Sequence, residues 1–232
     1  VAFSKGLKEI GKKAFALCFE LNSVDIPEGV ISIGDEAFLA CGACKTYGMY
    51  YDCYNFTKVT LPSTLMTIGA GAFRMCQCLQ SVNIPEGITE IKDSTFEECY
   101  KLANIIIPKK IKKIGSNAFY AYKASKIMTF SWNAPEIASK AFGGVTATCY
   151  YPSNNREWTS SMLQNYGGTL TWVAKIMEDG SGSGESGTGE TEDGKGNETG
   201  DGKEDGKGDG TGESESEGNT SGGNTSGGTG TG

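Results

Sequence analysis

A 23-residue repeat runs through most of this chain and limits its possible folds more than any other feature. The repeat reads Ile-Gly-x-x-Ala-Phe-x-x-Cys-x-x-Leu-x-x-Val-x-Ile-Pro-x-x-Val, and its leading isoleucines are Ile10, Ile33, Ile68, Ile91, Ile114 and Ile137. Successive isoleucines are 23 residues apart except for one interval of 35, which is a repeat with 12 residues inserted between Cys41 and Cys53. A fixed period of this length is the signature of a solenoid, in which each repeat forms one coil.

The order of residues within one repeat predicts a short strand followed by turns. Val24 and Ile26 are two residues apart, so both side chains face the same side of a strand. Pro27 has no N–H for a sheet and ends that strand, and Gly29 lets the chain turn. We place the Ala-Phe-x-x-Cys segment on a helical or 3₁₀ turn. Stacked coils would form a parallel sheet and a continuous core, so the pattern predicts an α/β repeat solenoid.

The two ends of the repeat array carry separate expectations. The repeat register extends back to Val1, so we expect the chain to begin inside a strand, with further repeats or a domain before it. After the last repeat, residues 156–164 are predicted to form a short helix and residues 169–174 a strand. Three bulky aromatic residues can cover the last coil there: Trp158, Tyr166 and Trp172.

Residues 178–232 differ sharply from the repeats. They contain no Ala, Val, Ile, Leu, Met, Phe, Trp, Tyr or Cys, so burial cannot offset the entropy of ordering them. They hold 14 of the 28 acidic residues but 3 of the 21 Lys and Arg, so their formal charge is −11 and the rest carries +4. We therefore predict a solenoid domain over residues 1–177 and a disordered, acidic, Gly/Ser/Thr-rich tail or linker over residues 178–232.

The repeated motif resembles the BspA-like class of bacterial leucine-rich repeats, over about residues 1–176. Residues 148–152, Trp158 and residues 165–172 also resemble the C-terminal cap of that family. The resemblance implies a right-handed leucine-rich-repeat coil with a cap, in a secreted or cell-surface protein that adheres to host proteins or cells. It transfers no catalytic or binding residue, because the recurring positions are core positions, and it gives the 12-residue insert no role.

The chain offers little that points to catalysis. It contains no histidine, which removes the commonest general base and the commonest nitrogen ligand for metals. The paired carboxylates Asp35-Glu36 and Glu97-Glu98 fall beside the recurring phenylalanines, where solvated turns explain them. We therefore expect a protein that is not an enzyme and needs no cofactor or metal.

The eight cysteines allow three interpretations. Cys18, Cys76 and Cys99 occupy one repeat position, which Cys41 or Cys53 fills in the interrupted repeat, and buried thiols pack as small apolar groups. Cys149 fits the core as well. Two cysteines fall outside this ladder, Cys44 and Cys78. They could take part in a zinc site or in a disulfide such as Cys44–Cys53 or Cys44–Cys78, because connectivity cannot be deduced from sequence.

A basic cluster follows one of the predicted strands, at Lys109, Lys110, Lys112 and Lys113. It could meet an anionic partner such as a sulfated glycan, although lysines on a solvated turn need no partner. No aromatic residues interleave with the cluster and the tail is anionic, so nucleic acid is not an expected partner.

Side chains alternate along a strand, so each predicted strand also has outward-facing residues. These are Ser23 and Asp25, Lys58 and Thr60, Ser81 and Asn83, Asn104 and Ile106, and Ile127 and Thr129. The outward set is polar at first and becomes apolar at Ile106 and Ile127, which we expect near each other on adjacent strands. Single exposed apolar residues are ordinary and can also mean nothing.

We interpret this face, together with the insert tyrosines, as the candidate partner-binding surface. Its residues are Asp25, Thr60, Asn83, Ile106, Ile127, Thr129, Tyr47, Tyr50 and Tyr51. The insert could equally be a tolerated surface loop. The sequence has no apolar run long enough to span a membrane. It therefore favours a secreted or surface-exposed monomer that binds a host or cell-surface protein, or a glycan; the alternative is a structural spacer in a longer repeat array.

Overall fold

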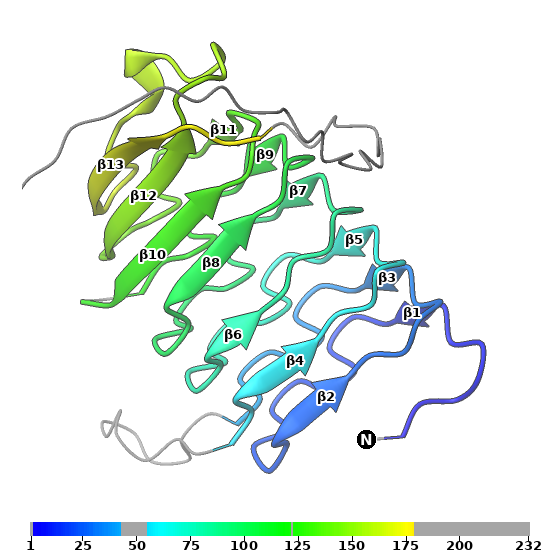
Figure 1. The fold of residues 1–232 in the computed structure, drawn as a ribbon. Helices are drawn as coiled ribbons and strands as arrows, with labels where there is room; N and C mark the ends of the chain where they lie inside the picture. Colours follow the sequence, from blue (N-terminus) through cyan, green and yellow to red (C-terminus); the bar gives the residue numbers. More distant parts are fainter. Residues whose placement is uncertain (1, 43–54, 122, 179–232) are drawn as a thin grey trace, which may run out of the picture. The chain divides into compact units, whose positions relative to one another are not determined.

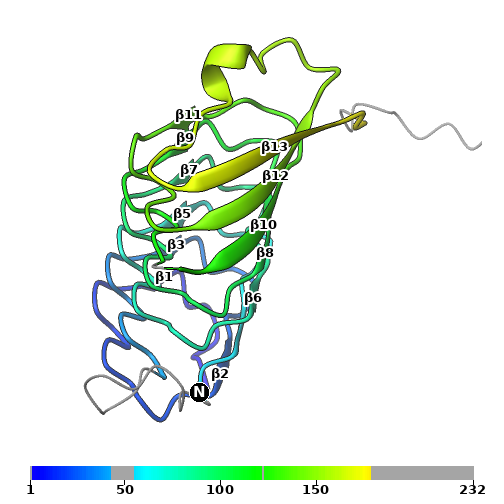
Figure 2. The ribbon, with the colours of Figure 1, turned by 90° about the vertical axis from the view of Figure 1, so that its left-hand side faces the viewer.

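The computed structural model describes residues 2–42, 55–121 and 123–178, and it shows a stack of β-coils (Figure 1). Each complete coil places one strand on a face that we call the front and a two-residue strand on the opposite, back side (Figure 2). The front strands are β2 (Ser23–Asp25), β4 (Lys58–Thr60), β6 (Ser81–Val82), β8 (Asn104–Ile107), β10 (Ser125–Phe130), β12 (Thr146–Pro152) and β13 (Thr169–Lys175). The back strands are β1 (Glu9–Ile10), β3 (Ser32–Ile33), β5 (Thr67–Ile68), β7 (Glu90–Ile91), β9 (Lys113–Ile114) and β11 (Glu136–Ile137).

All strand pairs are parallel, as the repeat predicts. The front strands form two sheets, β2-β4-β6 and β8-β10-β12-β13, and the back strands form β1-β3-β5 and β7-β9-β11. The pairing keeps the repeat register, so that Val24 lies beside Val59 and Ile91 beside Ile114. One period of 23 residues therefore forms one coil of the stack.

The core is a set of ladders in which each residue packs on its equivalent one coil away. The clearest is a stack of six rings, whose neighbouring centroids are 5.1–5.6 Å apart with interplanar angles of 3–10°. It consists of Phe15, Phe38, Phe73, Phe96, Phe119 and Phe142. The isoleucines of the back strands form a second buried ladder. One coil alone could not bury these side chains, so stacking supplies the core.

The predicted α/β character was wrong, because the Ala-Phe-x-x-Cys segments are hydrogen-bonded turns instead of helical ones. In the coils that begin at Ile10, Ile33, Ile68 and Ile91, the third and seventh residues after the isoleucine have positive φ, as at Glu36 (54°) and Ala40 (55°). Two left-handed residues four positions apart cannot belong to an α-helix. The described residues contain no α-helix, and the fold is a parallel β-solenoid.

The N–H groups of these turns alternate between two kinds of hydrogen bond: one donates within its own coil and the next donates to the following coil. The Ala37 N–H donates to the carbonyl of Gly34 in its own coil (3.3 Å), whereas the Phe38 N–H donates to the carbonyl of Ala72 one coil away (2.8 Å). We call this arrangement the turn ladder. It requires close approach of the coils: a Cβ added to Gly34 would lie 2.6 Å from the Lys12 nitrogen, which explains the glycine after the isoleucine.

The predicted elements at the two ends were partly correct. The predicted strand over 169–174 corresponds to β13, but the predicted helix over 156–164 is reduced to the 3₁₀ helix η1 (Ser160–Met162). Residues 2–8 contain no strand, so the expected opening strand is absent from the part of the chain that the structure describes. No described helix has the length and apolarity needed to cross a membrane.

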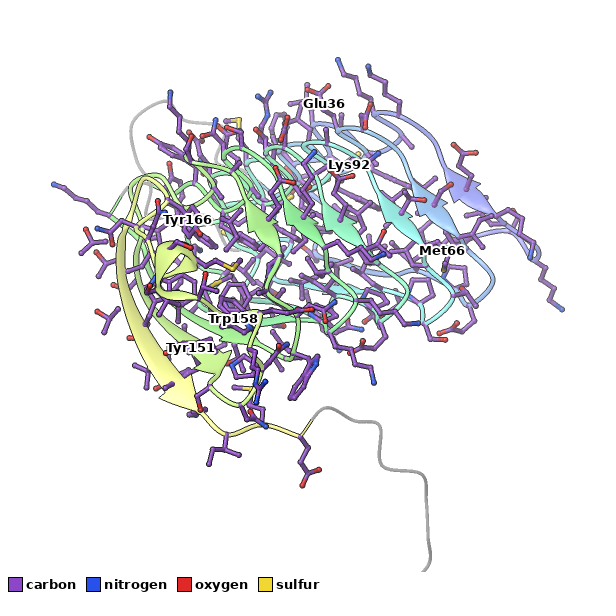
Figure 3. The ribbon with its side chains drawn as sticks, turned by 90° about the horizontal axis from the view of Figure 1, so that it is seen from above. Glu36, Met66, Lys92, Tyr151, Trp158 and Tyr166 are labelled. Atoms are coloured by element: carbon purple, nitrogen blue, oxygen red, sulfur yellow. The ribbon has the colours of Figure 1, made fainter. Side chains whose placement is uncertain are left out.

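Aromatic side chains gather against the last complete coil. Trp158 and Trp172 both contact Phe130, at ring centroid distances of 5.0 and 5.5 Å, and Tyr166 contacts Phe142 at 6.5 Å. Tyr151 and Trp158 also lie side by side at this end (Figure 3). These rings pack over the end of the core.

Candidate functional site

The front face presents two parallel columns of outward side chains. The strand pairing aligns Asn104, Ile127, Thr148 and Thr171 in one column. It aligns Ile106, Thr129, Tyr150 and Val173 in the other. In the other front sheet Ser23, Lys58 and Ser81 form one column, and Asp25 pairs with Thr60 in the second.

The half of this face on β8, β10, β12 and β13 is exposed and partly apolar. Ile106 is 65% exposed and Ile127 is 45% exposed. They lie on adjacent strands, as expected, but are diagonal neighbours, because Ile106 pairs with Thr129 and Ile127 with Asn104. The Nζ atom of Lys175 lies 3.8 Å from the ring centroid of Tyr150, which ends this patch with a cation over an aromatic face. We call Ile106, Ile127, Thr129, Thr148, Tyr150 and Val173 the apolar patch.

The half on β2, β4 and β6 is polar, and three of its side chains bond to the protein itself: Asp25, Thr60 and Asn83. The Thr60 hydroxyl donates to Asp25 Oδ1 at 2.6 Å. The Asn83 side-chain amide donates to the Leu61 carbonyl (3.3 Å), and its Oδ1 atom accepts from the Leu61 N–H (3.5 Å). Asn83 thus satisfies the backbone of the neighbouring coil at the point where strand β6 ends. These groups are less available to a partner than their exposure alone indicates.

The structure brings together part of the predicted site and extends it. Asp25, Thr60, Asn83, Ile106, Ile127 and Thr129 all lie on the front face. Tyr47, Tyr50 and Tyr51 lie outside the described residues. Sequence reasoning missed Tyr150 and Val173, because it related residues 148–152 to a cap and named no outward residues for the strand predicted over 169–174. The alternation in Thr146–Pro152 is the signal that could have placed Tyr150 in the outward column.

The recurring cysteines form a buried ladder of hydrogen-bonded thiols. The Sγ atoms of Cys41, Cys76 and Cys99 donate to the carbonyls of Phe15, Phe38 and Phe73 at 3.0–3.1 Å. Burial raises the pKa of Cys41 and of Cys99 to about 12, so neither is a ready nucleophile. Cys41 thus fills the ladder position in the interrupted repeat.

The remaining cysteines divide between the core and the insert. Cys149 is buried, as expected, and burial raises its pKa to about 12. Cys78 is buried as well, whereas Cys44 and Cys53 lie outside the described residues, so the proposed disulfides stay predictions. The described residues contain no cluster of three or more potential metal ligands.

Most charged pairs singled out in the sequence belong to the turn ladder and the back sheets. Glu36 lies between Lys13 (3.1 Å) and Arg74 (3.7 Å). Glu98 is half-buried instead of solvated, and burial, followed by repulsion from Glu97, raises its pKa. From the basic cluster, Lys113 pairs with Glu90 at 3.2 Å, so it is already engaged.

One buried cation was not predicted. Lys126 on β10 points into the core and is 4% exposed, and its Nζ atom donates to the carbonyls of Cys99 (3.0 Å) and Leu102 (2.5 Å). Burial lowers the pKa of this amine to about 8. The repeat pattern does not predict that Lys126 is buried, because Lys126 comes before the two apolar residues that recur in each strand.

Comparison with known proteins gives one family match. The model of the BspA-type leucine-rich-repeat region matches residues 1–49 and 46–166 as six copies of the repeat. No curated protein resembles the chain at a significant level.

Several solved structures are similar. A T. pallidum leucine-rich-repeat protein is 20% identical, with a TM-score of 0.45 over 73% of this chain and 81% of that one. A leucine-rich cell-surface protein from Faecalibacterium prausnitzii A2-165 is 23% identical, with a TM-score of 0.49 over 76% of this chain and 46% of that one. The pneumococcal vaccine antigen PcpA is 14% identical, with a TM-score of 0.49 and the same two coverages, so this chain spans about half the length of the last two proteins.

The repeat that the family model recognises is the same unit that forms the Phe stack, the thiol ladder and the parallel strands described above. This chain therefore belongs to the family of BspA-type leucine-rich-repeat proteins.

Proposed function

We propose that this protein is a secreted or cell-surface binding module whose apolar patch contacts a host or cell-surface protein. The observation that carries the proposal is the exposure of two large apolar side chains on the front face, Ile106 and Ile127, which lie beside threonines on the neighbouring strands. Exposed aliphatic and aromatic residues on a rigid sheet are typical of the centre of a protein interface.

Two further features support a protein partner. The patch has threonines between its apolar residues and a cation at its edge, which resembles a polar rim around an apolar centre. Family membership also favours binding over catalysis. A glycan is a second partner class, and we expect the module itself to be a monomer, because threonines interrupt the patch.

The test is adhesion of purified variants to matrix proteins and to cells. Ile106→Asp and Ile127→Asp place charges in the patch without removing buried contacts, so both should fold like the parent by circular dichroism and lose at least tenfold in binding. Tyr50→Ala tests the contribution of the insert separately.

Ser81→Asp is the matched control, because Ser81 occupies an outward column of the polar half. It should bind like the parent. If folded Ile106→Asp and Ile127→Asp also bind like the parent, the proposed surface is wrong and the module acts as a spacer or binds elsewhere.

The ends of the module carry two structural proposals. We infer that residues 178–232 are a flexible acidic spacer and that removal of the chain after Met177 leaves the melting temperature unchanged within about 2 °C. We also infer that the coil is right-handed, as parallel crossovers nearly always are, and that Trp158, Tyr166 and Trp172 act as a C-terminal cap. Trp158→Ala should then lower the melting temperature by several degrees, because Trp158 packs on Phe130 and donates to the Trp132 carbonyl (3.0 Å).

A further inference from the structure

The last coil continues only two sides of the solenoid. Its front strand β13 pairs with β12, and its turn segment accepts hydrogen bonds from the turn ladder, from Phe142 N–H to the Tyr166 carbonyl (3.1 Å) and from Gly144 N–H to the Gly167 carbonyl (3.3 Å). On the back, no described residue pairs with the outer edge of β11. The chain forms η1 there, and residues 153–178 supply no back strand for the last coil.

This leaves backbone groups of β11 directed at the open edge. In β9, one coil earlier, the carbonyls of Lys112 and Ile114 accept from the Glu136 and Ala138 N–H groups, both at 2.9 Å. The equivalent carbonyls in β11 belong to Pro135 and Ile137, and no described residue donates to either. An edge strand with unpaired donors and acceptors is a template for another strand.

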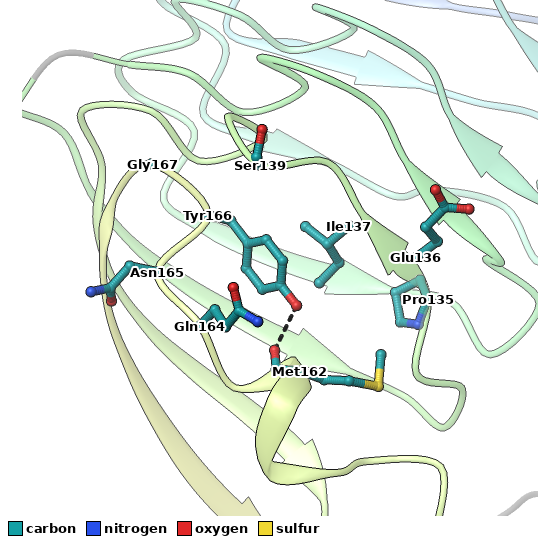
Figure 4. Close-up of a pocket in the computed structure, with 9 residues that line it drawn as sticks. All are labelled: Pro135, Glu136, Ile137, Ser139, Met162, Gln164, Asn165, Tyr166 and Gly167. Carbon is teal, nitrogen blue, oxygen red and sulfur yellow. Dashed lines mark hydrogen bonds between the residues drawn. The ribbon is translucent and has the colours of Figure 1, made fainter.

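A groove lies along this edge. Its volume is about 610 Å³, within the range of about 300–1,000 Å³ that is usual for ligand sites. Pro135, Glu136 and Ile137 form one wall, and Met162, Gln164 and Tyr166 form the other (Figure 4). The Tyr166 hydroxyl donates to the Met162 carbonyl (2.7 Å), which holds the ring beside Ile137. Ile137, the last residue of the isoleucine ladder, lines the groove and is 9% exposed, whereas Ile114 is completely buried.

The outward residues of the back sheet define the charge of a matching strand. Glu90, Lys113 and Glu136 lie side by side on β7, β9 and β11, and Lys113 Nζ is 3.2 Å from a Glu90 carboxylate oxygen. If another strand paired with β11 in the way that β9 pairs with β7, it would place a basic side chain beside Glu136 and an aliphatic one beside Ile137.

We propose that this groove binds an extended peptide segment with a basic–aliphatic sequence, which pairs in parallel with the open edge of β11. Backbone hydrogen bonds to the Pro135 and Ile137 carbonyls supply the pairing, and the alternating side chains supply the selectivity. The site is separate from the apolar patch on the front face and does not depend on it.

Charge and composition disfavour two other occupants. A second copy stacked through its β1 strand would place Glu9 beside Glu136, which brings like charges together. The acidic residues 178–232 of the chain itself contain lysines but no aliphatic residue to cover Ile137.

The probe is a capped, fluorescent peptide Ile-Lys-Lys-Ile-Gly-Ser, which reproduces residues 111–116 and hence the β9 partner of Glu90 and Ile91. Anisotropy titration of the full chain should give saturable binding, and hydrogen exchange of the Ile137 amide should slow when the peptide is bound. Glu136→Lys should weaken binding at least tenfold and should instead accept the peptide Ile-Glu-Glu-Ile-Gly-Ser. Ser139→Trp should also weaken it at least tenfold, since Ser139 is an exposed residue that lines the groove.

Ile106→Asp is the control that separates the two surfaces, because it should leave peptide binding unchanged. Absence of saturable binding by the parent, or binding that Glu136→Lys and Ser139→Trp both leave intact, would overturn the proposal. A parent that dimerises in sedimentation experiments, and becomes monomeric as Glu136→Lys, would overturn it in favour of a second copy.

Discussion

The two halves of the front face are built from one repeat but differ in strand length and in chemistry. The sheet β2-β4-β6 has strands of two or three residues, whereas β8, β10, β12 and β13 have four, six, seven and seven. In the first half Asp25, Thr60 and Asn83 bond within the protein. In the second half Ile106 and Ile127 are exposed.

A proline follows each strand of the first half, but the second half shows that proline does not set strand length by itself. Pro27, Pro62 and Pro85 follow the strands of the first half and cannot donate to a neighbouring coil. The equivalent residue after β10 is Ser131, whose N–H donates to the Ile107 carbonyl at 2.9 Å. Pro108 and Pro152 nevertheless occupy this position after β8 and at the end of β12. The strands β10 and β12 are longer mainly because both begin two residues earlier than β8. The repeat thus keeps its core while its surface diverges.

The first prediction has the largest expected effect. It tests whether the two halves of the solenoid differ only on the front face and share one core. Phe73→Ala and Phe119→Ala each remove a fully buried ring that stacks between two others, one in each half. Both should lower the free energy of unfolding by about 3–5 kcal/mol, because each loses buried area and leaves a cavity. Urea denaturation measures this. A much smaller loss for either variant would contradict a common core.

The second prediction concerns Lys126, which only the second half buries. Its pKa is about 8 in the folded chain, against a normal value of 10.5, so between these pH values the unfolded state binds more protons. The unfolding free energy of the parent should therefore rise relative to that of Lys126→Met by about 1.4 kcal/mol per pH unit between pH 8 and 10.5. Denaturation of both proteins across this pH range gives the difference between their unfolding free energies. The cysteines are the same in both proteins, so their contributions cancel.

Lys110→Met is the control for Lys126→Met, because Lys110 is exposed. It should show no such slope relative to the parent. A flat difference between the parent and Lys126→Met would mean that the amine stays solvated.

A third prediction tests the role of proline. Ser131→Pro removes the N–H that bonds to the Ile107 carbonyl and should cost about 1–3 kcal/mol, because that acceptor is left without a partner. Pro27→Ala, on the first half, should change stability by less than about 1 kcal/mol. Thermal and urea unfolding compare the two. Equal effects would show that the hydrogen bond from Ser131 to Ile107 adds nothing to stability.

The smallest effect concerns the polar half. Thr60→Val keeps the shape of the side chain but removes the 2.6 Å hydrogen bond to Asp25. Because this pair is near solvent, the loss should be below about 1 kcal/mol. Adhesion should be unaffected, in contrast to Ile106→Asp. A loss of binding in Thr60→Val would extend the contact surface to both halves.

Much of the fold followed from the sequence by itself. The period of 23, the inward pair at Val24 and Ile26, the Phe stack and the buried cysteine ladder all depend on which residues recur, and burial of apolar side chains requires their repetition. The outward direction of Ile106 and Ile127 followed from strand alternation alone.

Only the tertiary structure decided how the coils are joined and where they stop. The turn at Ala37-Phe38 could have been helical; hydrogen bonds to a coil 35 residues further along make it a ladder, and no local propensity contains that information. Lys126 is buried because β10 begins two residues earlier than the pairing of β8 requires, so it covers the carbonyls of Cys99 and Leu102. The groove at β11 exists because residues 153–178 supply a front strand and turns but no back strand. Which backbone groups stay unpaired depends on contacts between coils that are distant in sequence.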